Sequence, residues 1–189
     1  MNQTTTNSHT KFSTKQLVLI ALMTAITCIL APFSIPIPFS PVPISFTNLV
    51  LYISIFVLGY KMATVSYLVY LLLGLVGLPV FSGFTGGVAK LAGPTGGYLV
   101  GFIFMTMIAG LFTEKCHGKY RYTLYLLGMI FGTAICYAFG TIWLAKMMNL
   151  TFAQGLAAGV IPYLPGDAVK MVAALIVGPV LQKRLNNLQ

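Results

Sequence analysis

Charged side chains are scarce in this 189-residue chain: they make up 7% of the sequence, and only two residues are acidic. Ordinary soluble domains carry about 25% charged residues. Because 58% of the chain is hydrophobic, a fold in water would lack the polar groups to cover its surface. The apolar runs are continuous rather than alternating, which favours helices over a transmembrane barrel. We therefore predict an all-α, multi-pass membrane protein that forms a single domain over residues 1–189.

Catalytic and nucleotide-binding motifs are also missing. The chain contains no GxxxxGK[ST], GxSxG or HExxH sequence, so neither nucleotide hydrolysis nor a common hydrolase site is expected. Cys28, Cys116 and Cys136 show no CxxC spacing and no histidines at ligand spacing, so we predict neither a disulfide framework nor a metal site. A membrane enzyme needs a nucleophile beside a base, and the sequence indicates no such pair. We expect no enzyme activity and no cofactor.

The net charge of +9 does not indicate a nucleic-acid partner. The basic residues are scattered at the ends of apolar segments and form no patch interleaved with aromatic residues. Membrane topology explains such a distribution better, because cytoplasmic loops of membrane proteins are enriched in Lys and Arg.

Six apolar segments predict six membrane helices. A flexible cytoplasmic tail, residues 1–13, precedes them, and a proline-rich segment with no charge is expected to form an extended loop after the first helix. A glycine-rich loop precedes the fourth helix, and Thr151 is positioned to cap a short interfacial helix before Pro162. The predicted membrane helices cover roughly residues 15–33, 44–59, 62–76, 97–112, 122–148 and 167–182.

The basic residues predict the orientation of these helices. With six spans both termini lie on one side of the membrane, and that side holds eight of the eleven basic residues. The positive-inside rule places this side, and both termini, in the cytoplasm. Lys90, Lys146 and Lys170 then face outward, and Lys146 is expected to snorkel toward the membrane surface.

Asp167 is the most informative residue, because it is an acidic side chain at the start of an apolar helix. Lys170 follows at i+3, so both side chains share one helix face. One interpretation is an ion pair that stabilises the helix start, where the helix dipole favours a negative charge. The other is a pair of charged anchors for a polar ligand. We favour the ligand, because an ion pair at membrane depth is costly and apolar residues would serve packing better.

The glycine-rich segment that leads into the fourth helix offers a second wall for such a site. Glycine lets the backbone approach a ligand closely. Thr95 is placed either to cap this helix or to bind the ligand, and Tyr98 either belongs to the aromatic belt or lines a pocket. Separately, Ala21 and Ala25 form a small-xxx-small pattern on the first helix, a spacing that lets another helix come close.

Three stretches of the chain resemble one known family. They are Pro41-Val42-Pro43-Ile44-Ser45, Gly93-Pro94-Thr95-Gly96-Gly97-Tyr98-Leu99, and Pro165-Gly166-Asp167 with Lys170. Together they resemble the BioY family, the biotin-specific substrate-binding (S) components of energy-coupling factor (ECF) transporters. The resemblance covers nearly the whole chain. It implies a six-helix bundle of the S-component type in the bacterial cell membrane that binds biotin from outside.

The resemblance also implies partners and residue roles. A transmembrane coupling protein and two cytoplasmic ATPases would power uptake, and Ala21 and Ala25 would contact the coupling protein. Family members often have Gln at the position of Thr47, which makes the neighbouring Asn48 a candidate for ligand binding here.

The expected biotin site follows from these correspondences. Asp167 would accept hydrogen bonds from the ureido group, with Asn48 and Lys170 fixing the polar end. The pocket would be closed by Tyr98, Thr95 and the backbone around Gly93, and Lys90 would meet the valerate carboxylate. Two other functions stay open from the residues alone: an S component for another vitamin, and a stand-alone secondary transporter with Asp167 as its proton or sodium relay.

Overall fold

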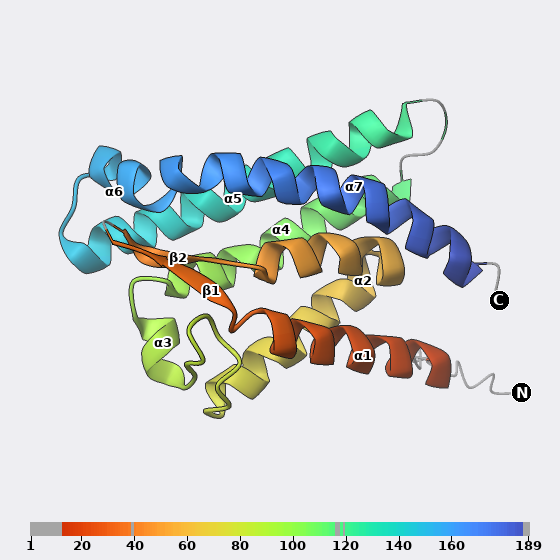
Figure 1. Cartoon of the computed structure of the whole chain (residues 1–189), viewed down its shortest axis with the longest axis horizontal. Coiled ribbons are helices and arrows are strands. Elements are labelled where there is room, and N and C mark those ends of the chain that lie inside the picture. Colours follow the sequence, from red (N-terminus) through yellow and green to blue (C-terminus); the bar gives the residue numbers. More distant parts are fainter. Residues whose placement is uncertain (1–12, 39, 116–117, 119, 187–189) are drawn as a thin grey trace, which may run out of the picture.

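The protein is a bundle of long helices with a small β-hairpin at one end (Figure 1). The computed structural model describes residues 13–38, 40–115, 118 and 120–186. Residues 1–12 of the predicted tail lie outside this range. The long helices are α1 (Thr14–Leu30), α2 (Thr47–Leu75), α4 (Gly96–Lys115), α5 (Arg121–Met148) and α7 (Leu164–Asn186). The shorter elements are β1 (Ser34–Ile37), β2 (Ser40–Ser45), α3 (Val88–Ala92), α6 (Phe152–Gly159) and the 3₁₀ turn η1 (Ile161–Tyr163).

Among the described residues, four helical segments are long and apolar enough to cross a membrane. They cover Thr47–Leu75, Gly96–Lys115, Arg121–Met148 and Phe152–Leu185, and α1 is a shorter apolar helix of 17 residues. The predicted sixth span begins earlier than expected, at Leu164 rather than Asp167. Pro165 is tolerated there because the first turn of a helix leaves its backbone N–H groups unpaired in any case.

Helix α2 contains the bend that the sequence predicted as a turn between two spans. Gly59 has φ 73° and ψ 172°, so two helical parts meet there at an angle. Only glycine adopts this region of φ readily. The chain therefore turns back at Gly59, and the two parts correspond to the spans predicted over residues 44–59 and 62–76 (Figure 1).

The proline-rich segment, predicted as an extended loop, is extended, but its two halves pair as a β-hairpin, which the prediction did not include. Strands β1 and β2 pair antiparallel, with Ser34 opposite Ser45 and Ile35 opposite Ile44. Proline cannot donate to a strand ladder and is confined to edge positions. In a two-stranded ribbon every strand has a free edge, so the prolines are accommodated. Residues 44–45 consequently belong to β2 rather than to the second helix, and α1 ends at Leu30, just before Pro32.

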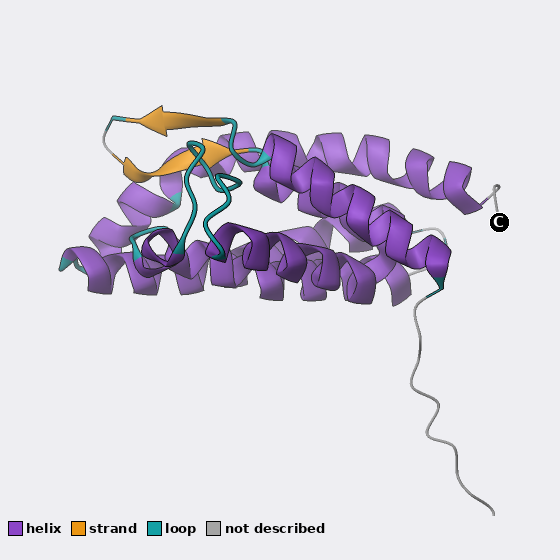
Figure 2. Ribbon diagram, turned by 90° about the horizontal axis from the view of Figure 1, so that it is seen from below, coloured by secondary structure: helices purple, strands orange, loops and turns teal. Residues whose placement is uncertain are grey.

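The glycine-rich segment after α2 packs back onto that helix. The Gly87 backbone N–H donates to the Gly74 carbonyl at 2.7 Å, and Phe81, which is fully buried, lies against Gly74. A Cβ at Gly74 would lie 2.1 Å from the Phe81 ring, so glycine is required for this contact. This segment leads through α3 into α4 at the hairpin end of the bundle (Figure 2).

Small residues and buried tyrosines hold the helices together. Helix α4 runs along α5, where Gly101 lies against Cys136 and Gly97 against Trp143. The Tyr67 hydroxyl of α2 donates to the Leu99 carbonyl at 2.8 Å, and the Tyr52 hydroxyl lies 2.5 Å from Thr133 Oγ1. These hydrogen bonds satisfy polar groups that would be costly to bury alone.

The two ends of the bundle differ in composition. The start of α1, the end of α4, the start of α5 and the end of α7 lie together at one end (Figure 1). The hairpin, α3 and α6 lie at the other. Thr151 caps α6 as predicted: Gln154 N–H donates to Thr151 Oγ1 and Thr151 N–H to Gln154 Oε1. The hairpin end holds the buried polar side chains of Thr47, Asn48, Thr95 and Asp167.

Candidate functional site

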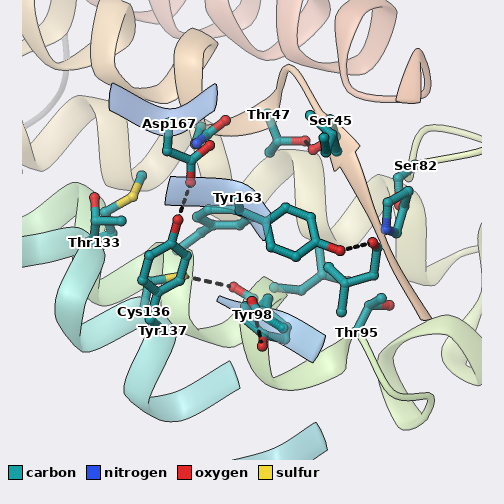
Figure 3. A pocket seen from close by; sticks show the side chains of 18 of the residues that line it. Ser45, Thr47, Ser82, Thr95, Tyr98, Thr133, Cys136, Tyr137, Tyr163 and Asp167 are labelled. Atoms are coloured by element: carbon teal, nitrogen blue, oxygen red, sulfur yellow. Dashed lines mark hydrogen bonds between the residues drawn. The ribbon is translucent and has the colours of Figure 1, made fainter. Parts of the chain in front are cut away.

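A pocket opens at the hairpin end between β2, the first turns of α2, α4 and α7, and the middle of α5 (Figure 3). The space within it, including its open mouth, is about 710 Å³. Apolar side chains such as Leu99, Phe102 and Met105 line one part, and hydroxyl, amide and charged groups line another.

The structure brings five of the predicted site residues into this lining. Asp167, Lys170, Asn48, Tyr98 and Thr95 all face the pocket, although they come from the starts of three separate helices, α2, α4 and α7. Their roles in ligand binding stay predictions. Gly93 and Lys90 are not lining residues.

Asp167 is buried, with 7% of its surface exposed, and two donors hold its carboxylate. Lys170 Nζ donates to Oδ1 at 3.0 Å, and the Tyr137 hydroxyl donates to Oδ2 at 2.5 Å. Figure 3 draws the bond between Tyr137 and Asp167 as a dashed line. An ionised carboxylate has about four lone-pair positions. Two of these therefore remain for a ligand.

Lys170 lies at the centre of a three-way contact. Its ammonium donates to the Ser45 carbonyl at 2.8 Å, to Asn48 Oδ1 at 3.0 Å and to Asp167 Oδ1 at 3.0 Å. These bonds join β2, α2 and α7. Both interpretations of the pair are thus compatible with the geometry, because the ion pair is internally bonded and also faces the pocket.

Tyr98 is wedged between two glycines. Its hydroxyl donates to the Gly159 carbonyl at 3.0 Å, and a Cβ at Gly140 or Gly159 would lie 2.2 or 2.0 Å from its side chain. The ring therefore has one position, walling the pocket on the side of α5 and α6. Thr95 is also buried, and its hydroxyl makes no hydrogen bond to any described residue. The predicted capping role for this hydroxyl is not seen, while its backbone carbonyl accepts from Tyr98 and Leu99.

The glycine run serves helix packing more than an open approach to the pocket. The Gly93 carbonyl accepts from Trp143 Nε1 at 2.9 Å, and a Cβ at Gly96 would lie 1.7 Å from the Leu91 carbonyl oxygen. Lys90 lies on α3, and partial burial lowers the pKa of its ammonium because burial disfavours the charged form. The predicted contacts of Gly93 and Lys90 with a ligand stay predictions.

The hairpin is fastened over the pocket by Tyr163. Its hydroxyl donates to the Val42 carbonyl and lies 2.6 Å from Ser40 Oγ, and Ser40 in turn donates to the Ala158 carbonyl at 2.7 Å. This contact, which we call the hairpin clasp (Ser40, Val42, Ala158 and Tyr163), holds β2 against α6 and η1. Val42 to Ser45 consequently form one wall of the pocket.

Several lining residues were not predicted from the sequence. Tyr137, Thr133 and Cys136 reach the pocket from α5, and Ser82 from the glycine-rich segment. On α5 a signal was present, because Thr133, Cys136, Tyr137, Gly140 and Thr141 recur at helical spacing as a stripe of small and polar residues. For Ser82 the sequence held no comparable signal, because its position depends on the path of an irregular segment.

Ala21 and Ala25 lie on the exposed face of α1, away from α2. The opposite face carries Met23, Thr24 and Thr27, which are buried. Thr24 Oγ1 lies 2.9 Å from Ser66 Oγ and fixes α1 against the second part of α2. The alanine face is thus exposed, and its contact with a coupling protein stays a prediction.

Fold and site together define a helical membrane protein with a partly polar pocket at one end of its bundle. The chain belongs to the BioY family, whose sequence model matches residues 2–187. It is 38% identical over 168 residues to a probable biotin transporter BioY of Pyrococcus horikoshii, covering 89% of this chain and 96% of that protein. It is 36% identical over 169 residues to the biotin transporter BioY of Thermotoga maritima, with 89% and 96% covered.

The fold is also that of a solved relative. The crystal structure at 2.1 Å of the S-component for biotin from an ECF-type ABC transporter superposes with a TM-score of 0.82 at 31% sequence identity. The match covers 92% of this chain and 95% of that one. The expectation of an S-component fold is therefore confirmed.

Proposed function

We propose that this protein binds biotin in the pocket beside Asp167 and delivers it for uptake as the substrate-specific subunit of an ECF-type transporter. The observation that carries the proposal is the buried Asp167 carboxylate, which has two acceptor positions left after its bonds to Lys170 and Tyr137. The relatives named as biotin transporters, and the biotin S-component of the same fold, support the choice of ligand.

The polar end of the pocket is complementary to a ureido group. Such a group has two N–H donors and one carbonyl acceptor. Asp167 offers the acceptors, and the Asn48 amide N–H groups, which have no hydrogen-bond partner among the described residues, offer donors. The apolar wall formed by Leu99, Phe102 and Met105 suits the thioether ring and aliphatic chain.

Partners follow from what a substrate-binding subunit needs. Uptake against a gradient requires energy, and the sequence offers no nucleotide-binding motif. We propose that a transmembrane coupling protein and two cytoplasmic ATPases supply it, with Ala21 and Ala25 on the open face of α1 as contact points. No cofactor takes part in this account.

We further propose six membrane passes in the bacterial cell membrane, with both termini in the cytoplasm. The bend at Gly59 divides α2 into two passes, which with α1, α4, α5 and α7 makes six. The end of the bundle that holds the start of α1 and the end of α7 also carries most basic residues, in keeping with the positive-inside rule (Figure 1).

Competition binding tests the ligand directly. The full-length protein in detergent, loaded with radiolabelled biotin, should release it to excess unlabelled biotin but not to thiamine or riboflavin. Displacement by either of the other vitamins at lower concentration than biotin would reassign the ligand. Uptake in cells with and without co-expressed coupling protein and ATPases then separates an S component, which needs them, from a stand-alone transporter.

A further inference from the structure

The pocket lining holds one acidic and one basic side chain, Asp167 and Lys170. Both belong to the same ion pair, so together they add no net charge. The remaining polar groups of the lining are hydroxyls, one amide and one thiol. Whether a ligand's own charge is recognised therefore depends on whether Lys170 has any donor to spare.

Lys170 has none. A lysine ammonium carries three protons, and three acceptors lie within 3.0 Å of Nζ: the Ser45 carbonyl, Asn48 Oδ1 and Asp167 Oδ1. A carboxylate arriving at this ammonium has to displace one of these bonds. Because the side chain is largely buried, at 11% exposure, a displaced acceptor is not readily solvated in exchange.

Open hydrogen-bonding positions are found beside Lys170 rather than on it. Asp167 keeps two acceptor positions, and the Asn48 amide keeps its two N–H donors. This pattern of donors and acceptors fits a neutral ring such as a ureido group. Farther from the pair, the polar groups of the lining include the hydroxyls of Ser82 and Thr95, which bind an amide or an alcohol as readily as a carboxylate.

We infer that the pocket recognises the ureido ring and not the carboxylate, so its ligands include biotin derivatives whose carboxyl group is blocked as a neutral amide or alcohol. The inference rests on the proposed function, and it names the ligand class of the same site. The carboxylate of biotin lies toward the pocket mouth, where water solvates it. Removal of its charge therefore leaves affinity nearly unchanged.

The test compares biotin with biotinamide, in which the carboxylate is replaced by a neutral primary amide. Titration calorimetry on the full-length protein should give dissociation constants within about threefold of each other, since no charge-assisted bond is lost. A biotinamide affinity at least about thirtyfold weaker than that of biotin would overturn the inference, because a cation would then be meeting the carboxylate. Absence of binding by biotin itself would instead overturn the proposed function.

Lys90→Gln provides the second arm, because the sequence predicted Lys90 as the partner of the carboxylate. If the inference holds, the ratio of the two dissociation constants is the same in this variant and in the unaltered protein. A variant that loses affinity for biotin but not for biotinamide would assign the carboxylate to Lys90 and contradict the inference.

Discussion

Tyr137 determines how the Asp167 carboxylate is presented to the pocket. Its hydroxyl donates to Oδ2 at 2.5 Å while Lys170 donates to Oδ1, so the two donors hold the carboxylate from both sides. Neither oxygen is then free to turn away from a ligand. Tyr137 lines the pocket, yet its contribution acts through Asp167, which makes it a positioning residue.

The Tyr137→Phe variant should therefore bind biotin about fivefold more weakly, corresponding to a hydrogen bond of about 1 kcal/mol. Tyr67→Phe is the matched control, because its hydroxyl is also buried and bonded, to the Leu99 carbonyl, but lies outside the pocket lining. Both variants should lower the melting temperature, whereas only Tyr137→Phe should change the affinity measured by calorimetry. Equal affinities in the two variants would remove Tyr137 from the site.

Asp167 and Tyr137 differ in how far the sequence alone could predict that they belong to the site. Asp167 was predictable because an acidic side chain in an apolar segment is costly. Thr95 and Tyr98 were candidates because the glycine-rich segment leads into the fourth helix there, and Asn48 followed from the family resemblance. Tyr137 was not predicted, although it belongs to the stripe of small and polar residues on α5, because the stripe alone does not show that this helix face lies toward Asp167. The rotation of α5 is set by its close packing on α4 through Gly101 and Gly132.

At the scale of elements, the hairpin and the starts of three helices form the pocket, and their fit depends on small residues. Gly140 on α5 leaves room for the Tyr98 ring, because a Cβ at position 140 would lie 2.2 Å from that ring. Gly140→Ala should displace this ring, lower the stability by about 1–3 kcal/mol as overpacking does, and weaken biotin binding. The melting temperature and the dissociation constant measure the two effects.

Gly166→Ala is a strict control for that variant, because Gly166 directly precedes Asp167 in the chain but a Cβ there meets nothing within 4 Å. It should retain both affinity and melting temperature. If Gly140→Ala also retained its biotin affinity and melting temperature, the position of the Tyr98 ring between Gly140 and Gly159 would not matter for the site.

The hairpin clasp predicts a kinetic effect. Tyr163→Phe removes the hydroxyl that bonds the Val42 carbonyl and approaches Ser40, so β2 loses its main tie to η1. Bound biotin should then dissociate several-fold faster, at a cost of about 1 kcal/mol. Release of radiolabelled biotin after dilution measures the rate; an unchanged rate would show that the hairpin does not retain the ligand.

The hairpin also marks the limit of sequence reasoning about elements. Four prolines in β1, β2 and their connection excluded a helix correctly, but they also concealed the strand pairing, since proline normally counts against a strand. The bend at Gly59 was easier to predict, because a glycine followed by polar residues interrupts a long apolar run.

For the whole molecule, the account predicts which end of the bundle faces the outside of the cell. In a background with the three native cysteines replaced by alanine, Lys61→Cys and Val88→Cys place single thiols near the bend of α2 and at the start of α3, both at exposed positions. A membrane-impermeant thiol reagent added to intact cells should label the cysteine at position 88 and not that at position 61. The reverse pattern would invert the orientation and place the pocket inside the cell.

The amino-acid composition predicts the helical membrane fold better than it predicts the site. Scarce charge and long apolar runs predicted a helical membrane protein, and the clustering of basic residues predicted which segment ends lie together, as Figure 1 shows. The saturation of Lys170 by three acceptors from β2, α2 and α7 was beyond such reasoning, because two of them, the Ser45 carbonyl and Asn48 Oδ1, lie more than 120 residues away in the sequence.

Calorimetric titration of biotin into the unaltered protein, Asp167→Asn and Glu114→Gln tests the central claim most directly. These are the two acidic residues of the chain, and Glu114 lies near the end of α4 that is remote from the hairpin. The account predicts that Asp167→Asn weakens binding by about 10- to 100-fold, as loss of a hydrogen bond to a charged group does, and that Glu114→Gln leaves it unchanged. An unchanged affinity in Asp167→Asn would contradict the assignment of this pocket as the biotin site.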